Sequence, residues 1–297
     1  MSDSCEVAIR FFAPPEELRR YFTTFYLIEV KVPDGGEVTD YLHPEWANFR
    51  FHSGALPVAR MRDGSTMPRT AFAVTGPSSA AIRFTVGSTR MWGVGILPLG
   101  WAKFVCTPAA RFADLAVDGN IHAEFAALRP LAQDIFADEP DLDGELARIA
   151  RHFLERLDNP LPDEDRIFAI HAALVDPDTR NVADLAERAG VTSRTVERVC
   201  HRAFGFPPRL LLRRQRFMRS LAHFMLDPSL NWIGAMDGHY HDQAQFVRDF
   251  RQFMGMRPRE YAALPKPILG AVLFERARFA GAAVQTLDGP DGARVSD

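Results

Sequence analysis

The pattern that decides the fold occurs twice, as TSRTVERVCHRAFGFPP at residues 192–208 and as DQAQFVRDFRQFMGMRP at residues 242–258. Each copy opens on a helix-capping residue, Thr192 or Asp242, and ends on a glycine, Gly205 or Gly255, with a proline a few residues beyond. Apolar residues recur at i, i+4 and i+7: Val196, Cys200 and Ala203 in the first copy, and Phe246, Phe250 and Phe253 in the second. Each copy is therefore predicted to be a short capped helix with one buried face.

A second predicted helix precedes the first copy. Asn181 is its capping residue, Gly190 is its end, and the small side chain of Ala186 permits a close crossing with the helix that follows. This arrangement predicts a helix-turn-helix unit whose second helix is the recognition helix. Cys200 then occupies a core position, which argues against a reactive Cys200-His201 pair, and three cysteines without a CxxC motif fit a reducing compartment.

The second unit matches this pattern less well. Ala235 would take the part of Ala186 but lies one residue further from its cap, and the glycine expected at 239 is His239, with Gly238 one place earlier. Either the first helix of this unit ends one residue sooner, or His239 adopts a strained left-handed conformation. Residues 208–224 contain no helix breaker and predict a continuous linker helix between the two units.

Charge is divided unevenly along the chain. Residues 176–264 contain 14 Arg, no Lys and 10 acidic residues, a net charge of +4, whereas residues 1–175 contain 17 basic and 24 acidic residues, a net charge of −7. A basic module that binds phosphates, joined to an acidic module that does not, has this distribution. An arginine-rich composition alone is the alternative explanation, but Arg198 and Arg248 occupy the same turn of both copies.

Residues from about 180 to 264 resemble the double helix-turn-helix DNA-binding domain of AraC-type transcriptional regulators. The resemblance rests on the Ala-x-x-x-Gly of the first unit, on an arginine followed by Gly and Pro at the same spacing in both copies, on Asp242-Gln243, and on the closing Pro258-Arg-Glu-Tyr261. It implies double-stranded DNA as a partner and, by family, RNA polymerase as another.

Helix geometry predicts which side chains reach DNA. Arginine can bind guanine and glutamate can accept from cytosine, whereas Ala244 and Val247 offer only apolar contact, so the first recognition helix should discriminate more strongly. Gln245 either flanks the second surface or closes a capping box with Asp242. The expected base contacts are Arg194, Glu197, Arg198, Gln243, Ala244, Val247 and Arg248, and the expected phosphate contacts are Ser193, His201, Arg202, Arg213, Arg214 and Arg251.

Residues 1 to about 120 have a different pattern. Short β-rich runs separated by turns occupy residues 26–32, 46–52, 70–75, 81–86 and 91–97. They predict a small antiparallel β barrel or sandwich, which resembles the cupin-like regulatory barrel of many AraC-type regulators. The expected fold class is α+β, with this barrel followed by an all-α domain of two helix-turn-helix units.

Candidate ligand-binding residues in the barrel are few. His43, Glu45 and His52 form a metal-binding candidate set without a third imidazole or thiolate, so neither a metal nor another cofactor is expected. If a small-molecule effector binds, Arg50, His52 and Trp92 are the candidates that would line its pocket, although packed or solvated positions explain these residues equally well.

Helices are also predicted between the barrel and the DNA-binding region, around residues 125–135, 146–157 and 166–174. Their apolar faces fit either contact with a second copy in a homodimer or intramolecular core. The expected divisions are a barrel at 1–120, a helical connector at 121–175, the tandem helix-turn-helix domain at 176–264 and a tail at 265–297. The tail has an apolar run at 268–274 and an end, from residue 288, that is expected to fray.

The sequence therefore predicts a sequence-specific double-stranded-DNA-binding transcriptional regulator and not an enzyme. Its polar start and the absence of a membrane-length apolar run lead us to expect a cytoplasmic protein without membrane contact. Two alternatives remain at this stage. The barrel could be a cupin-like enzyme with an appended helical module, or the helix-turn-helix scaffold could serve protein contact.

Overall fold

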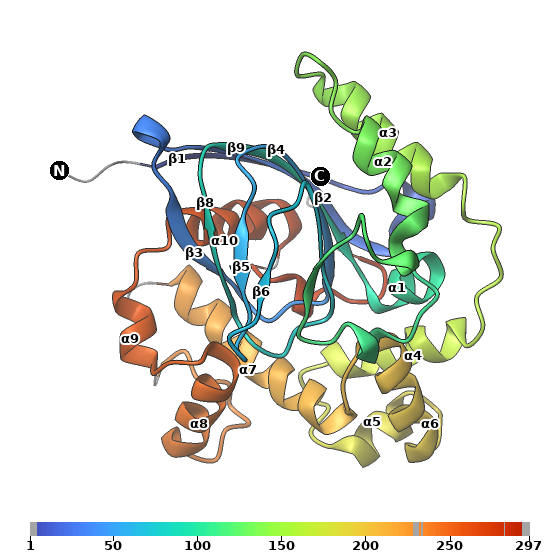
Figure 1. The fold of residues 1–297 in the computed structure, drawn as a ribbon. Coiled ribbons are helices and arrows are strands. Elements are labelled where there is room, and N and C mark those ends of the chain that lie inside the picture. Colours follow the sequence, from blue (N-terminus) through green and yellow to red (C-terminus); the bar gives the residue numbers. More distant parts are fainter. Residues whose placement is uncertain (1–4, 228–231, 233, 282, 293–297) are drawn as a thin grey trace.

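The computed structural model describes residues 5–227, 232, 234–281 and 283–292 and has the expected α+β fold, with a barrel-like pair of sheets above a group of helices (Figure 1). The strand order is β1-β2-β9-β4-β7-β10 in the larger sheet and β3-β8-β5-β6 in the smaller one, and neighbouring strands are antiparallel. The strands are β1 (Glu6–Phe12), β2 (Phe22–Lys31), β3 (Val38–Leu42), β4 (Ala47–Gly54), β5 (Val58–Arg60), β6 (Thr66–Met67), β7 (Phe72–Thr75), β8 (Ile82–Val86), β9 (Thr89–Ile96) and β10 (Ala116–Asp118).

The side chains of β4 point alternately to the two faces of the larger sheet, and these faces have different environments. Phe49 and Phe51 are buried in the main hydrophobic cluster on one face of the larger sheet. Asn48, Arg50 and His52 lie on the opposite face and line a cavity on the inner side of the barrel. The period of two in this sequence thus decides which side chains can meet a ligand.

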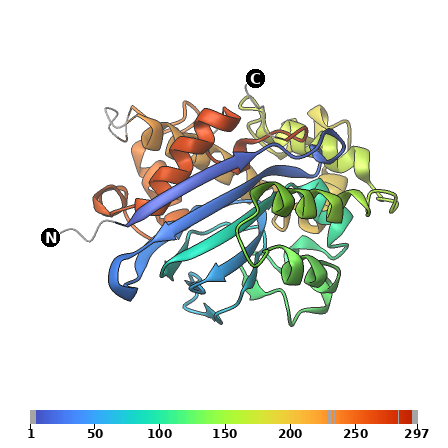
Figure 2. The same cartoon turned by 90° about the horizontal axis from the view of Figure 1, so that it is seen from above.

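Helices cover the outer face of the larger sheet and fill the lower part of the molecule (Figures 1 and 2). Phe153 packs its ring 4.5 Å from Phe22 and 6.5 Å from Phe49, measured between centroids, so the apolar face of the connector is intramolecular core. The helices are α1 (Pro98–Phe104), α2 (Arg129–Asp134), α3 (Leu142–Leu154), α4 (Glu164–Val175), α5 (Val182–Arg188), α6 (Ser193–Val199), α7 (Pro208–Leu226), α8 (Gln243–Met254), α9 (Pro258–Ala263) and α10 (Pro267–Ala280).

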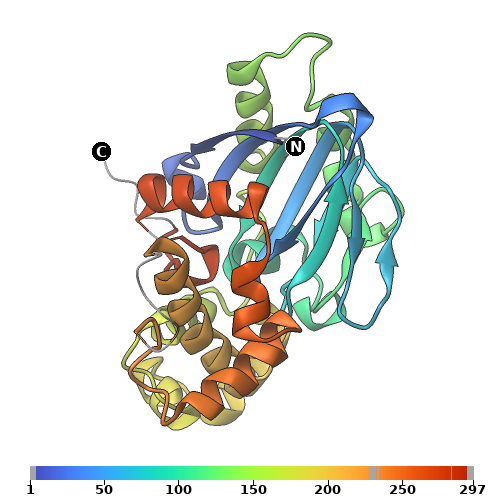
Figure 3. The same ribbon diagram turned by 90° about the vertical axis from the view of Figure 1, so that its left-hand side faces the viewer.

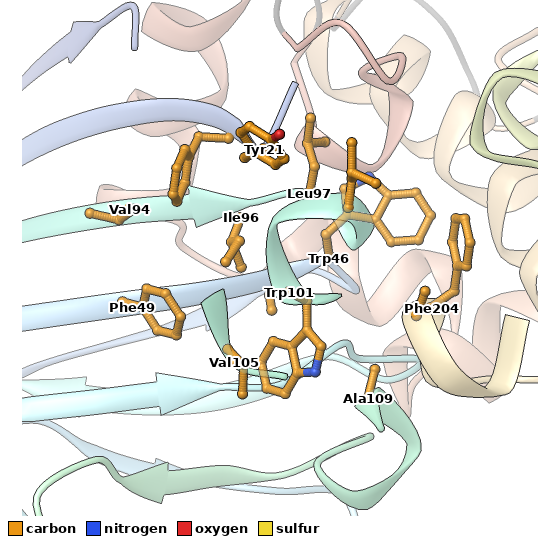
Figure 4. Packing of buried hydrophobic residues seen from close by; sticks show 14 of the residues in the cluster. Tyr21, Trp46, Phe49, Val94, Ile96, Leu97, Trp101, Val105, Ala109 and Phe204 are labelled. Atoms are coloured by element: carbon orange, nitrogen blue, oxygen red, sulfur yellow. The ribbon is translucent and has the colours of Figure 1, made fainter. Parts of the chain in front are cut away.

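The main hydrophobic core continues from the barrel into the first helix-turn-helix unit. The ring of Trp46, just before β4, lies 5.3 Å from that of His171 on α4 and 5.8 Å from that of Phe204, measured between centroids. Figure 4 shows Trp46 beside Phe204. The cluster that contains Phe49 and Ile96 also contains Leu185 and Val196. The barrel therefore shares its main core with the helices, because aromatic residues at its lower end pack directly on them.

The C-terminal helix α10 packs beside β1 and β3 (Figure 3). Asp40 on β3 accepts hydrogen bonds from the backbone N–H groups of Ile268 and Leu269, each at 2.8 Å, and so satisfies donors at the start of the helix. Asp288 is buried and paired with Arg276, so the fraying expected from residue 288 does not begin there, and residues 293–297 lie outside the described part. Among the described residues, no helix has the length and apolar character needed to cross a membrane.

Candidate nucleic-acid interface

The first helix-turn-helix unit forms as its sequence predicts. The Asn181 side chain accepts from the N–H groups of Ala183 and Asp184, and Thr192 Oγ1 accepts from the N–H of Thr195 at 3.2 Å. Gly190 takes the left-handed conformation, with φ of 64°, at the turn between α5 and α6. The recognition helix continues past α6 as a π-helical turn, Cys200–Phe204, in which Cys200 is fully buried.

The second unit keeps its recognition helix. Asp242 caps α8 through a 2.7 Å hydrogen bond from the N–H of Gln245, and Gly255 ends it with φ of 74°. The Gln245 side-chain oxygen accepts from the N–H of His241 at 3.2 Å, one residue before Asp242, whose N–H a capping box would use. Ala235 is buried, but residues 232 and 234–241 form turns and no regular helix, and residues 228–231 and 233 of the expected first helix lie outside the described part.

The left-handed conformation considered for His239 is wrong. Among the described residues, the non-glycine residues with positive φ are Cys106, Asp114 and Asp163. His239 instead donates its backbone N–H to Asp237 Oδ1 at 2.9 Å, and Asp237 is held by Arg219 of α7 at 2.5 Å. The extra residue in this turn is therefore accommodated by a side-chain bond to the linker helix, without backbone strain.

Both recognition helices lie at the same end of the molecule, joined by α7 and directed away from the barrel (Figure 1). A 19-residue helix is about 28 Å long, close to one turn of DNA. The predicted base-contacting side chains lie at the surface: Arg194, Glu197, Arg198, Gln243, Ala244 and Arg248 are exposed, and Val247 is half-buried.

Arg198 has an intramolecular partner. Its guanidinium lies 2.8 Å from Asp163 Oδ2 at the start of α4, with Arg166 on the other carboxylate oxygen at 2.6 Å. Hydrogen bonds from Arg198 and then from Arg166 lower the pKa of Asp163 to about 2. In this conformation, a side chain expected to contact a base is held by the connector.

The residues expected to contact phosphates fall into three groups: four exposed residues, the partly exposed Arg213 and the buried Arg214. Ser193, His201, Arg202 and Arg251 are exposed. Arg213 is 41 % exposed and pairs with Asp249 of α8 at 2.5 Å, so it braces the linker against the second recognition helix.

The expectation for Arg214 is wrong for this conformation. Arg214 has no exposed surface, its guanidinium lies 4.3 Å from the centroid of the Trp46 ring, and it donates to the carbonyl of Ser78 at 2.8 Å. Burial lowers its pKa to about 9. Sequence reasoning placed it near DNA because a linker arginine is usually solvated, but the barrel covers this side of α7.

Comparison with known families assigns this part of the chain. A family described as a helix-turn-helix domain matches residues 185–263, which span both recognition helices and α7. Residues 185–263 are a helix-turn-helix domain of the AraC type. The chain is accordingly a DNA-binding transcriptional regulator.

Other comparisons are distant. No curated protein sequence matches the regulator. ToxT from Vibrio cholerae O395 has a TM-score of 0.42 at 12 % identity, covering 87 % of this chain and 96 % of its own. ToxT from strain SCE256 with bound unsaturated fatty acid has a TM-score of 0.38 at 13 % identity, covering 87 % and 94 %. The AraC-like transcriptional activator CuxR has a TM-score of 0.28 at 11 % identity, covering 73 % and 87 %.

The regulator also contains a cavity of about 160 Å³ on the inner side of its barrel. Arg50 and His52 line it, as expected for effector-binding candidates, but Trp92 does not. Trp92 is fully buried on the opposite face of the larger sheet and donates its indole N–H to Glu145 at 2.6 Å. Two of the three candidate residues are therefore together, and the third belongs to the core.

The C-terminal segment supplies residues of the cavity wall that sequence reasoning missed. Ile268, Leu269, Val272, Leu273 and Arg276 of α10 line the cavity opposite the barrel strands. The apolar run 268–274 was visible in the sequence, but nothing local to it indicated which surface it would cover.

Two of the three metal-binding candidates of the barrel, His43 and Glu45, have other partners. His43 Nε2 lies 2.7 Å from the Tyr261 hydroxyl, and Glu45 pairs with Arg50 at 2.7 Å. In the part of the chain that the structure describes, no three His, Cys, Asp or Glu residues are grouped so that they could hold a metal ion.

Proposed function

We propose that this regulator binds double-stranded DNA sequence-specifically in the cytoplasm, with both recognition helices in successive major grooves on one side of the duplex. The observation that carries this proposal is the placement of two capped recognition helices at one end of the molecule, with the 19-residue helix α7 and residues 227–242 between them in the chain (Figure 1). The Arg213–Asp249 pair links α7 to α8 and supports a defined position of the second recognition helix on the linker.

The two helices contribute unequally to selectivity in this proposal. The first exposes two arginines and a glutamate, which can form bidentate contacts to guanine and accept from cytosine. The second exposes Arg248 beside Ala244 and the half-buried Val247, which offer apolar contact to a thymine methyl group. Ser193, His201, Arg202 and Arg251 surround these surfaces and are the proposed phosphate contacts.

The experiment is selection of bound fragments from random DNA, followed by substitution of every base pair in the selected site. Arg198→Ala should weaken binding by roughly 1–3 kcal/mol and relax selectivity at one guanine. Arg248→Ala, the matched change in the other helix, should relax selectivity less. Equal losses of selectivity would contradict the asymmetry, and absence of salt-dependent DNA binding would favour a protein-contact role for the scaffold.

The barrel cavity is the proposed effector site of the regulator. It lies between the inner faces of the barrel and α10, and α10 follows α9 of the DNA-binding domain after residues 264–266. A ligand that touches α10 therefore lies next to an element attached to the second recognition unit. RNA polymerase and a second copy of the chain are further proposed partners, in line with the family resemblance.

Enzymatic activity is not part of this proposal. Two members of the candidate metal set are engaged in protein contacts, since His43 bonds to Tyr261 and Glu45 to Arg50. Purified protein should contain no stoichiometric zinc, iron or manganese. Elemental analysis that finds one metal ion per chain, lost after His43→Ala or His52→Ala, would support the cupin-like enzyme instead.

A further inference from the structure

The charged side chains that line the cavity form ion pairs with residues of the same protein. Arg50 donates to Glu45 Oε1 at 2.7 Å and to Thr75 Oγ1 at 2.7 Å. The second Glu45 oxygen accepts from Gln285 Nε2 at 3.1 Å. On the α10 side, Arg276 pairs with the buried Asp288. An ionic ligand would lose its hydration here without meeting an uncompensated charge of these residues.

His52 differs from its neighbours on β4. On the same face of that strand, the Asn48 amide oxygen accepts from the Tyr26 hydroxyl at 3.0 Å, and Arg50 has the partners given above. His52 is 8 % exposed, and both of its ring nitrogens are buried without a partner among the described residues. His43, the other imidazole of the wall, already bonds to Tyr261.

A buried imidazole with two unused nitrogens indicates a missing polar partner, because buried polar groups in proteins are nearly always hydrogen-bonded. Burial, and secondarily the charge of Arg50, lower the pKa of His52 to about 3, so the ring is neutral at physiological pH. A neutral imidazole can donate one hydrogen bond and accept one. It therefore suits a hydroxyl or carbonyl group better than a carboxylate.

The rest of the wall is mainly apolar, with Tyr26, Ile28 and Met91 on the barrel side and Val272 and Leu273 on α10. A volume of about 160 Å³ is close to that of an engineered apolar cavity of about 150 Å³ that holds benzene. These dimensions fit one ring with a small substituent.

We propose that the cavity binds a small neutral compound with a single aromatic or alicyclic ring and one hydroxyl or carbonyl substituent, which hydrogen-bonds to His52. This inference rests on the proposed role of the cavity as the effector site. It adds the chemical class of the ligand and names His52 as the residue that selects the polar substituent.

The test compares three probes of similar size on the full chain at pH 7.5: 4-methylphenol, toluene and benzoate. Titration calorimetry or ligand-observed NMR should give 4-methylphenol a Kd about 3- to 10-fold lower than toluene, the range expected for one neutral hydrogen bond. Benzoate should not bind at the same concentrations. Equal binding of benzoate, or failure of both neutral probes to bind, would overturn the proposal.

Two variants assign the preference to its residue. His52→Leu should retain toluene binding and bring the two neutral probes within about twofold of each other, since it removes the hydrogen-bonding group. Met91→Leu is the matched control, because Met91 faces His52 across the β4–β9 pair and lines the same cavity. It should keep the preference for 4-methylphenol, and an unchanged preference in His52→Leu would overturn the role of His52.

A measurement on the unsubstituted chain avoids dependence on the folding of a variant. Nitrogen NMR of the His52 ring should show a shift with 4-methylphenol and a much smaller one with toluene. Equal shifts would contradict a hydrogen bond at this ring. DNA binding of the same protein without probes tests the regulator separately: selective DNA binding without probe binding removes this inference alone, whereas probe binding without DNA binding removes the proposed function.

Discussion

At the scale of single residues, three arginines that the sequence predicts to contact DNA have different environments. Arg198 is exposed and paired with Asp163, Arg213 braces two helices, and Arg214 is fully buried over Trp46. Their contributions to DNA binding should differ accordingly.

Asp163 should compete with DNA for the Arg198 side chain. Asp163→Asn should tighten binding to the selected site by up to about fivefold, because an exposed ion pair contributes at most about 1 kcal/mol. Asparagine tolerates the left-handed conformation of residue 163, whose φ is 63°. The control is Asp165→Asn, which removes the same charge two residues away. An equal gain in that control would mean general repulsion of DNA and no specific competition.

Arg214 should not contribute to phosphate binding, because it is buried under the barrel. Arg214→Met should leave the salt dependence of DNA affinity unchanged and should not lower Tm much, because a long apolar side chain replaces a buried charge whose Nε and Nη2 have no partner among the described residues. Arg202→Ala, at an exposed position, should reduce the slope of log affinity against log salt by about one. A reduced slope in Arg214→Met would show that this side chain leaves the core on DNA binding.

At the scale of elements, α10 depends on a contact that is distant in sequence. The backbone N–H groups of Ile268 and Leu269 in its first turn donate to the Asp40 carboxylate of β3. Nearer its C-terminal end, the Arg276 side chain pairs with Asp288. Docking of this helix on the barrel is therefore a tertiary event, and the shape of the cavity depends on it.

Asp40→Ala should weaken that docking by about 0.5–2 kcal/mol, the range for loss of a helix-capping side chain. Hydrogen exchange should become faster across residues 268–280 while β4 and β9 keep their protection. Asp141→Ala provides the same chemical change at another helix, because Asp141 accepts from the N–H of Gly144 at 3.1 Å at the start of α3. Faster exchange across α10 in that control would mean a global loss of stability.

At the scale of the whole molecule, buried histidines make folding sensitive to acid. Burial is the first cause that lowers the pKa values of His43, His52 and His171, each to about 3, and that of His152 to about 4. Because the folded-state pKa lies below the unfolded value of about 6.5, each contribution to stability is complete above pH 6.5 and is lost as pH falls towards 3. Asp288 opposes this, since burial raises its pKa to about 6 and its protonation between pH 6 and about 4 favours the folded state.

Unfolding should therefore take up a net of about three protons between pH 6 and 4.5, four from the histidines less one from Asp288. The free energy of unfolding should fall by roughly 3–4 kcal/mol per pH unit across this range. Urea titrations at pH 7, 6, 5 and 4.5 measure it, and His171→Phe should reduce the slope by about one proton. A slope near zero would contradict the neutral buried state of these rings.

The sequence by itself determined the local elements of the DNA-binding domain and the alternation of the barrel strands. Thr192, Asp242, Gly205 and Gly255 act within a few residues of themselves, through caps and left-handed turns, so their effect is readable without knowing the rest of the fold. The same applies to the alternation along residues 48–52, which places Arg50 and His52 together.

The tertiary structure alone decided which surfaces meet. In the folded protein, Arg214 is buried under the barrel and Arg198 pairs with Asp163. Trp92 lies in the core, and residues of the segment 268–276 line the cavity. These contacts join residues far apart in sequence, and a linker arginine or an apolar helix carries no local signal for its partner. Burial energies depend on the area that another element covers, and chain folding sets that area.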